Sequence, residues 1–275
     1  MKFGEVICEE SIVAYRAKLM DRELSQNTID SYITAVRQYQ EAHTRVSKED
    51  MLSWKRELMD TGKKPSTVNL RLAAMNTWCR MFDIREAEVR TLKIHQASAI
   101  DNVITQEDYA KLCKHLNDDN PRWYFNIRLL ASTGARVSEY IKLTKADFDR
   151  GYTEMWTKGK IRRIYIPKSF ITEAQEYYKN LQPHETLVQS IHGKPITTRG
   201  VSENLLRFAE KYGIDKRVMH PHSFRHLFAL NFLSKNNNLS LLADIMGHSS
   251  VSTTAIYTRM TKQQQATAVD EIVNW

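Results

Sequence analysis

Apolar residues recur at intervals of three and four through residues 1 to 92, between polar residues, and this spacing predicts helices in nearly all of that stretch. One helix is expected to begin at Ser25 or Asn27, because either side chain can cap a first turn. Two more are expected, one from Ser47 and one capped by Ser66. Their apolar stripes need packing partners, so this part of the chain is expected to be a compact helical bundle.

Residues 93–103 lose this periodicity and are small and polar in the middle, which indicates a linker between two domains. From residue 104 the pattern is mixed, and helical stretches surround two β-rich runs, Tyr152–Trp156 and Arg163–Ile166. Between these runs stands Lys158-Gly159-Lys160, a sequence typical of a hairpin turn. The predicted fold is therefore mainly α, with a small antiparallel β-sheet in the second of two domains.

The 275 residues include 40 Lys and Arg against 32 Asp and Glu, which gives a formal net charge of +8. Such an excess favours polyanionic partners, nucleic acid first among them, although it is also compatible with a protein that its charge merely keeps in solution. The three cysteines stand too far apart for a metal cluster or a redox pair. No apolar run approaches the roughly 18 to 20 residues that span a bilayer, so a soluble, cytoplasmic protein without membrane partners is expected.

Two segments combine cationic or proton-transferring side chains with turn residues. In the first, Gly134 interrupts the chain and Arg136 opens a helix, where its forked guanidinium could bind a phosphate or simply pair with Glu139. In the second, His222 and Arg225 stand three positions apart on one face of a helix. Three histidines within seven residues raise the question of zinc, but no carboxylate or cysteine accompanies them, and a metal site is not expected.

A third segment holds a histidine and a tyrosine beside a helix end. Gly247 fits a helix C-cap, which leaves His248 just beyond the last turn. A new helix is expected from Ser252 or Thr253, so that Tyr257 falls about one turn into it. A lone tyrosine at helical spacing is ordinarily a core or interface residue. A chemical role for Tyr257 is indicated only when this segment is considered together with the other two.

Together, the three segments resemble the tyrosine recombinase, or phage integrase, family. The motifs occur in the family's order: TGARVSE at 133–139, HSFRH at 222–226, Gly247-His248 and IYTR at 256–259. Tyr257 also stands nine positions after His248, and Lys158 lies where the family keeps its catalytic lysine on a β-hairpin. The resemblance covers residues 104–275 and extends more weakly to 1–92, which is similar to the family's SAM-like core-binding domain. The two domains would form a clamp around DNA.

The resemblance implies a role for each of these side chains. Arg136 and Arg225 would bind the non-bridging oxygens of a DNA phosphate, and Tyr257 would attack it to leave a 3′-phosphotyrosyl bond and a free 5′ hydroxyl. His222 would act as general base. Lys158 would act as general acid, with Lys160 as its rival. His248 would donate a hydrogen bond to the phosphate, and Glu139 would orient its neighbours. No metal, other cofactor or ATP would be required.

The implied function is site-specific recombination by four protomers on two double-stranded DNA sites, with a monomer or dimer when free. We expect the integrating and excising enzyme of a mobile element or prophage, with a Xer-like dimer resolvase or a DNA invertase as the alternatives. A catalytically silent DNA-binding regulator is the alternative from another class, and a type IB topoisomerase-like enzyme is a further one. The apolar residues after Tyr257 are expected to dock on a neighbouring protomer or to pack on their own domain.

Overall fold

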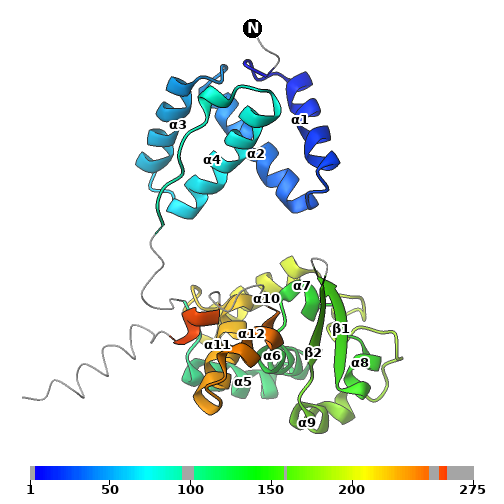
Figure 1. The fold of residues 1–275 in the computed structure, drawn as a ribbon. Helices are drawn as coiled ribbons and strands as arrows, with labels where there is room; N and C mark the ends of the chain where they lie inside the picture. The colour runs from blue at the N-terminus through cyan, green and yellow to red at the C-terminus, as the bar shows by residue number, and fades with distance from the viewer. Residues whose placement is uncertain (1–3, 95–101, 158–159, 248–253, 259–275) are drawn as a thin grey trace, which may run out of the picture. The chain divides into compact units, whose positions relative to one another are not determined.

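The computed structural model describes residues 4–94, 102–157, 160–247 and 254–258, and the chain separates into two compact units, Met1–Gln96 and Ala97–Trp275 (Figure 1). Each unit has a hydrophobic core of its own. Helices predominate in both, and the strands among the described residues form one two-stranded sheet in the second unit. The predicted fold class, mainly helical with a small antiparallel sheet in the second part, is confirmed. Among the helices described, none has the length and apolar character needed to cross a membrane.

The first unit is a helical bundle whose helix starts follow from local capping. Ser25 accepts a hydrogen bond from the amide three residues on at 3.3 Å, and Ser47 does the same at 3.1 Å, so both start helices as predicted. Ser66 does not cap the next helix, because that helix already begins at Pro65, whose fixed φ suits a first turn. The elements of this unit are α1 Glu9–Asp21, α2 Gln26–Ala42, α3 Lys48–Asp60, α4 Pro65–Met81 and η1 Arg85–Ala87.

The core of the first unit centres on Trp78 of α4, which is fully buried. Its ring centroid lies 4.9 Å from that of Tyr15 in α1 and 4.6 Å from that of Phe82. Its indole N–H donates to the carbonyl of Gly4 at 2.9 Å, so the one polar group of this large side chain is satisfied. This bond holds Gly4 against α4.

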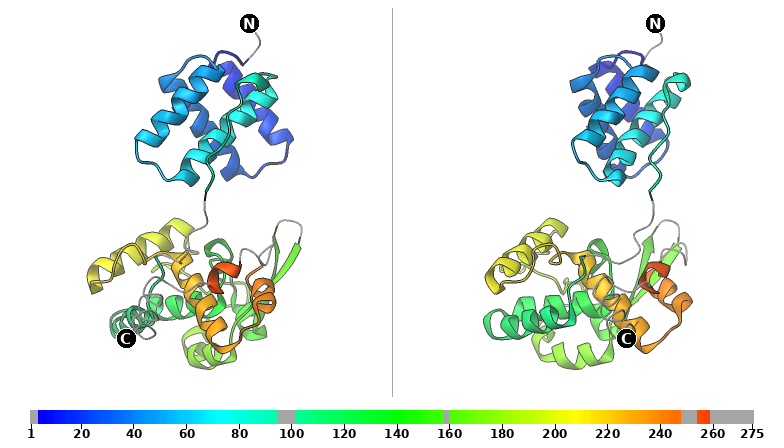
Figure 2. Two further views of the ribbon diagram at one scale, coloured as in Figure 1. Left: turned by 60° about the vertical axis from the view of Figure 1, so that its left-hand side comes forward. Right: turned by 90° about the vertical axis from the view of Figure 1, so that its left-hand side faces the viewer.

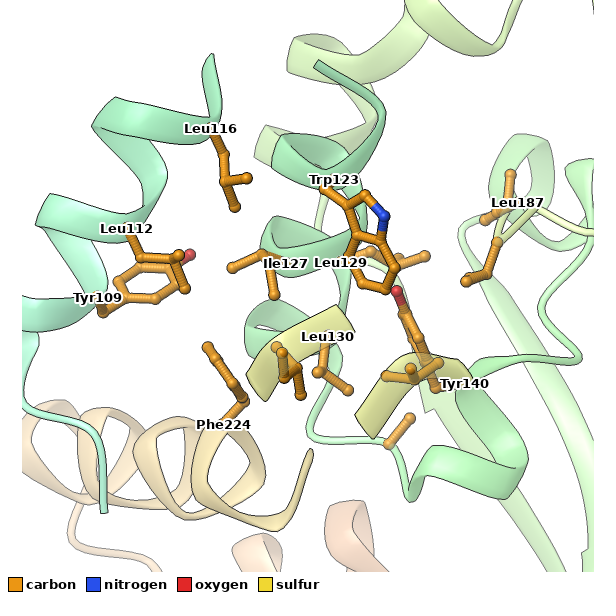
Figure 3. Close-up of a cluster of buried hydrophobic side chains, with 14 of the residues drawn as sticks. Tyr109, Leu112, Leu116, Trp123, Ile127, Leu129, Leu130, Tyr140, Leu187 and Phe224 are labelled. Atoms are coloured by element: carbon orange, nitrogen blue, oxygen red, sulfur yellow. The ribbon is translucent and has the colours of Figure 1, made fainter. Parts of the chain in front are cut away.

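The second unit packs α5, α6 and α11 around a common core, to which Leu112, Trp123 and Phe224 belong (Figure 3). Thr105 caps α5 by accepting from the Asp108 amide at 3.0 Å. The elements of this unit are α5 Gln106–Asp119, α6 Pro121–Thr133, α7 Val137–Tyr140, α8 Lys145–Arg150, β1 Tyr152–Thr157, β2 Lys160–Tyr165, α9 Lys168–Tyr178, α10 Thr198–Tyr212, α11 Pro221–Lys235, α12 Leu239–Met246 and η2 Ala255–Thr258.

The sheet is an antiparallel hairpin in which Thr157 pairs with Lys160 at the end next to the turn. The second strand begins three residues earlier than the predicted run at Arg163, so Lys160 belongs to β2 and not to the turn. Side chains alternate between the faces of a strand, and this alternation buries Arg162 and exposes Arg163. Figure 2 shows α12 beside the hairpin, and α12 packs against β2 while η2 packs against α11.

Candidate active site

Arg136 is placed by the turn between α6 and α7. Gly134 ends α6 with φ of +58°, in the left-handed region, and a Cβ there would lie 2.4 Å from Cδ1 of Phe228, so only glycine fits. Arg136 then occupies the N-cap of α7, where its backbone N–H donates to Oε2 of Glu139 at 2.7 Å. Its Nη1 donates to Oε1 of the same carboxylate at 3.0 Å, while its side chain remains about a third exposed at 32%.

Arg225 is placed by α11, which begins with His220 as N-cap and Pro221 in the first turn. Its guanidinium is buried and donates to the carbonyl oxygens of Met246, at 2.6 Å, and of Gly134. Burial and the neighbouring charges of two other arginines lower its pKa to about 10, which still leaves it protonated at neutral pH. A buried guanidinium that is charged at neutral pH is suited to bind an anion.

His222 lies three positions before Arg225 on α11, and its side chain is exposed. Desolvation lowers the pKa of its imidazole, and the positive charges of Arg225 and Arg136 lower it further. The imidazole is therefore neutral at pH 7, which is the form that accepts a proton. The structure thus brings His222 into the electrostatic reach of both predicted arginines.

The C-terminal end of α12 is held by three arginines. Gly247 terminates this helix in the left-handed conformation, as predicted for a C-cap. The last carbonyl groups of a helix have no partner within it and lie at the negative end of its dipole. Here three successive carbonyl oxygens accept from three different guanidinium groups, with Ile245 bound by Arg162, Met246 by Arg225 and Gly247 by Arg136, the last at 2.9 Å.

Arg162 is a member of this cluster that the sequence reasoning missed. It is buried, and it forms an ion pair with Glu139 besides its bonds to the carbonyl of Ile245. Burial raises the pKa of Glu139, but hydrogen bonds from Arg162 and from the Arg136 backbone outweigh this effect, so the pKa lies below its ordinary value. Had the second strand been predicted to start at Lys160, strand alternation would have marked Arg162 as an inward-facing charge.

Tyr257 lies in the short helix η2 and is buried, with 5% of its surface exposed. Burial raises its pKa to about 12, and the charge of Arg225 offsets only part of this rise. Its hydroxyl lies 2.8 Å from Nδ1 of His226, the residue after Arg225. His226 belongs to the HSFRH motif, but no role was predicted for it. No local signal would have found this contact, because it joins residues 31 positions apart.

Lys158 and His248 lie outside the described residues, and of Lys160 only its place at the start of β2 is described. The described part of the predicted site therefore consists of Arg136, His222, Arg225 and Tyr257. Within the described ranges, no cluster of three or more His, Cys, Asp or Glu side chains is placed to hold a metal ion. The arrangement combines a cluster of guanidinium groups with a phenol, groups that can bind a phosphate and attack it.

Comparison with known proteins agrees with this chemistry. The sequence model of the phage integrase family matches residues 102–264, and that of the phage integrase N-terminal SAM-like domain matches residues 12–82. The chain therefore belongs to the phage integrase family of tyrosine recombinases, enzymes that cleave and rejoin DNA strands. Its activity is site-specific DNA recombination.

Relatives and solved structures extend the likeness over most of the chain. A tyrosine recombinase XerD of Halalkalibacterium halodurans is 30% identical over 274 aligned positions, which cover 88% of this chain and 90% of the relative. A lambda integrase dimer bound to a COC′ core site has a TM-score of 0.75 at 17% identity, covering 91% of this chain and 94% of that one. A lambda integrase tetramer bound to a Holliday junction has a TM-score of 0.73 at 18% identity, covering 92% and 77%. The two structures show a shared fold.

Proposed function

We propose that DNA cleavage by this recombinase uses Tyr257 as the nucleophile and Arg136 and Arg225 as the groups that bind the scissile phosphate. The phenol oxygen bonds to phosphorus while the bond from phosphorus to the 5′ oxygen breaks, which leaves a 3′-phosphotyrosyl link and a 5′ hydroxyl. The arginines stabilise the negative charge that builds up on the non-bridging oxygens. Rejoining reverses these steps, so neither ATP nor a metal is needed to restore the phosphodiester.

One observation carries this proposal: Arg225, which binds the phosphate, and His226, which contacts the nucleophile, are consecutive residues of α11. Arg225 reaches the carbonyls of Gly134 and Met246, and His226 lies 2.8 Å from the hydroxyl of Tyr257. The backbone of a helix fixes the positions of neighbouring residues, so the guanidinium of Arg225 and the phenol of Tyr257 are held at a fixed separation. Holding reacting groups in register supplies a large part of the rate enhancement in such reactions.

Two proton transfers complete the reaction. The hydroxyl of Tyr257 contacts His226 in the structure, and its proton passes to His222 as general base. The family resemblance assigns this role to His222, and the lowered pKa that keeps its imidazole neutral supports it. The departing 5′ oxygen takes a proton from Lys158, with Lys160 as the rival donor, and His248 donates a hydrogen bond to the phosphate. The assignments of these last three residues rest on the family resemblance.

The two parts of the chain divide the binding of double-stranded DNA. Residues 1–92 form the core-binding domain, 93–103 the linker, and 104–275 the catalytic domain with its C-terminal tail, so that the two domains clamp the duplex. The match of residues 12–82 to the SAM-like domain of phage integrases supports this division. The net charge of +8 supports a polyanionic partner.

Recombination requires four protomers on two DNA sites, because each of four strands must be cut and exchanged. Lambda integrase, whose fold this chain shares, has been solved as a dimer on a core site and as a tetramer on a Holliday junction. We extend this assembly to the present chain, with a monomer or dimer in the absence of DNA. The apolar residues of the tail lie outside the described residues, and their docking on a neighbouring protomer stays a prediction, with packing on their own domain as the alternative.

The biological role that we propose is integration and excision of a mobile element or prophage. Resolution of chromosome or plasmid dimers is the second candidate, favoured by the 30% identity to a XerD recombinase. The position of the natural DNA site in the genome distinguishes these two roles. Sites at both ends of an inserted element support integration, whereas one site in a chromosome or plasmid supports dimer resolution.

Covalent capture tests the nucleophile. The protein is mixed with sheared genomic DNA, attached fragments are sequenced, and a suicide substrate is built from the recovered site. Tyr257→Phe is expected to bind this substrate but to form no covalent adduct, because it lacks the attacking oxygen. Tyr177→Phe, which changes an exposed tyrosine in α9, serves as the control and is expected to react like the unaltered protein. An adduct that persists in Tyr257→Phe would falsify the assignment.

A further inference from the structure

Arg162 joins three segments of the catalytic unit through one buried guanidinium. Its Nη1 pairs with Oε2 of Glu139, and its Nε and Nη2 donate to the carbonyl of Ile245 at 3.2 and 3.0 Å. Nη2 also approaches the carbonyl of Gly134 at 3.4 Å. These partners lie at the start of α7, at the end of α12 and in the turn after α6. Burial of a charge is unfavourable unless it is paired in this way, so this enclosed cation serves to hold segments together.

The neighbouring residue, Arg163, carries the same charge in a different environment. It points to the opposite face, where it is exposed and pairs with Glu154. It also lies over the ring of Tyr152, 4.7 Å from the centroid. Surface pairs of this kind contribute little to stability. Arg163 thus provides a matched control for any change made at Arg162.

Glu139 is shared between Arg162 and Arg136, and this sharing determines where the Arg136 fork can point. Oε1 of the carboxylate accepts from Nη1 of Arg136, whereas Oε2 accepts from Arg162 and from the Arg136 backbone. Without Arg162, the full charge of Glu139 would be balanced by Arg136 alone. The guanidinium of Arg136 would then be drawn to both carboxylate oxygens and away from a phosphate.

The charges in the described cluster also indicate that Arg162 supports phosphate binding. Arg136, Arg162 and Arg225 contribute three positive charges and Glu139 one negative charge, which leaves a net charge of +2. The pentacoordinate transition state of a phosphodiester carries about two negative charges. Removing Arg162 would halve the compensating charge.

Arg162 also lies directly against Gly247, whose carbonyl holds Arg136. A Cβ on Gly247 would be 2.3 Å from Cδ and 2.8 Å from Nε of Arg162. The side chain of Arg162 therefore packs against the residue that accepts from Nη2 of Arg136 at 2.9 Å. Displacement of this side chain would disturb both supports of Arg136, its carboxylate and its carbonyl.

We propose that Arg162 is a positioning residue for DNA cleavage, which neutralises one oxygen of Glu139 and fixes the end of α12 so that the fork of Arg136 stays available for the scissile phosphate. The inference rests on the proposed role of Arg136 at that phosphate. Arg162 itself is enclosed and acts through its neighbours.

The test compares Arg162→Lys, Arg162→Met and the control Arg163→Met in single-turnover cleavage of a suicide substrate at saturating DNA. For Arg162→Lys, which keeps the charge but loses the fork, we expect cleavage to slow on the order of 10²-fold, with site affinity unchanged within about twofold. Arg162→Met is expected to be slower still, and Arg163→Met to cleave at the normal rate. Thermal unfolding of each variant shows what fraction is folded at the assay temperature.

A second substrate separates positioning from general structural damage. A methylphosphonate at the scissile position has no charge on its non-bridging oxygen, so its transition state needs less cationic compensation. For Arg162→Lys we expect the loss of cleavage rate to be at least about tenfold smaller on this substrate than on the phosphodiester. The same relief is expected for Arg136→Ala, which serves as the comparison variant. Damage to folding alone would slow cleavage of both substrates equally.

The outcomes distinguish the inference from the function on which it rests. If Arg136→Ala loses as much activity on the methylphosphonate as on the phosphodiester, the proposed role of Arg136 is wrong. If Arg136→Ala is relieved but folded Arg162→Lys is not, or if Arg162→Lys cleaves normally, the positioning role is overturned. A loss in Arg162→Lys that merely follows its unfolded fraction overturns it as well.

Discussion

The phenol of Tyr257 and the imidazoles near it illustrate how single residues are adapted to phosphate chemistry. Burial raises the pKa of Tyr257 to about 12, and the contact with His226 occupies its hydroxyl. With this pKa the phenol is neutral at pH 7. Desolvation and nearby arginines have the opposite consequence for His222, whose pKa falls and whose imidazole stays ready to accept a proton. Burial disfavours the charged form of each group, so it raises the pKa of the phenol and lowers that of the imidazole, whereas the nearby arginines lower the pKa of both.

This difference predicts the pH dependence of cleavage at subsaturating DNA, which reports groups of the free enzyme. Because the pKa of His222 lies below its ordinary value of 6.5, its base form persists to lower pH. Cleavage is expected to be constant between about pH 7 and 8 and to fall with a midpoint below pH 6.5. His222→Asn should lack this midpoint and cleave slowly throughout, whereas His184→Asn, at an exposed position, should keep it. A midpoint above 6.5 in the unaltered protein would contradict the direction of the shift.

At the scale of elements, the end of α12 is the structural centre of the site. Three arginines, at the start of α7, in β2 and in α11, bind its last carbonyls, so the helix end organises the cations that the reaction needs. Gly247 makes this possible, because it turns the chain at φ of +61° and leaves room for Arg162. The hairpin, the α6–α7 turn and α11 meet at this one helix terminus.

Gly247→Ala is therefore expected to be more harmful than the same change at Gly62. Both glycines have positive φ, but a Cβ at Gly62 meets nothing within 4 Å, whereas at Gly247 it collides with Arg162. Backbone strain should lower the free energy of unfolding by about 1 kcal/mol in both variants. The collision should add roughly 1–3 kcal/mol in Gly247→Ala and slow its cleavage. Urea denaturation and cleavage assays measure these effects, and equal losses in the two variants would refute the collision.

At the scale of the whole molecule, each unit is stabilised by its own core. Trp78 anchors the core of the first unit and Trp123 that of the second, and both side chains are almost completely enclosed. A unit with an independent core can unfold as an independent cooperative transition. Each unit can then take part in DNA binding with a free energy of unfolding that its own core determines.

Calorimetry of the full chain tests this independence. Trp78→Ala is expected to destabilise the first unit by about 3–5 kcal/mol and to lower its transition temperature, while the transition of the second unit is retained. Trp123→Ala is expected to produce the reverse pattern. A single transition that shifts equally in both variants would mean that the units unfold together.

Much of the helical structure and the choice of chemical residues could be predicted from the sequence, because both depend on local information. Ser25, Ser47 and Thr105 cap helices through bonds to amides three residues away, and Gly247 ends a helix through its own φ. The start of β2 could not be predicted with the same accuracy, since strand bounds depend on the partner strand. That error of three residues hid the inward direction of Arg162.

The mainly helical fold, the order of the motifs and the family follow from the sequence alone, because periodicity, capping and spacing are properties of neighbouring residues. The contact of His226 with the hydroxyl of Tyr257 and the sharing of Glu139 between Arg162 and Arg136 follow only from the three-dimensional packing. These contacts join residues that are 31 and 23 positions apart. Their partners are selected by how α7, α11, α12 and the hairpin pack against one another, and a linear pattern carries no record of that packing.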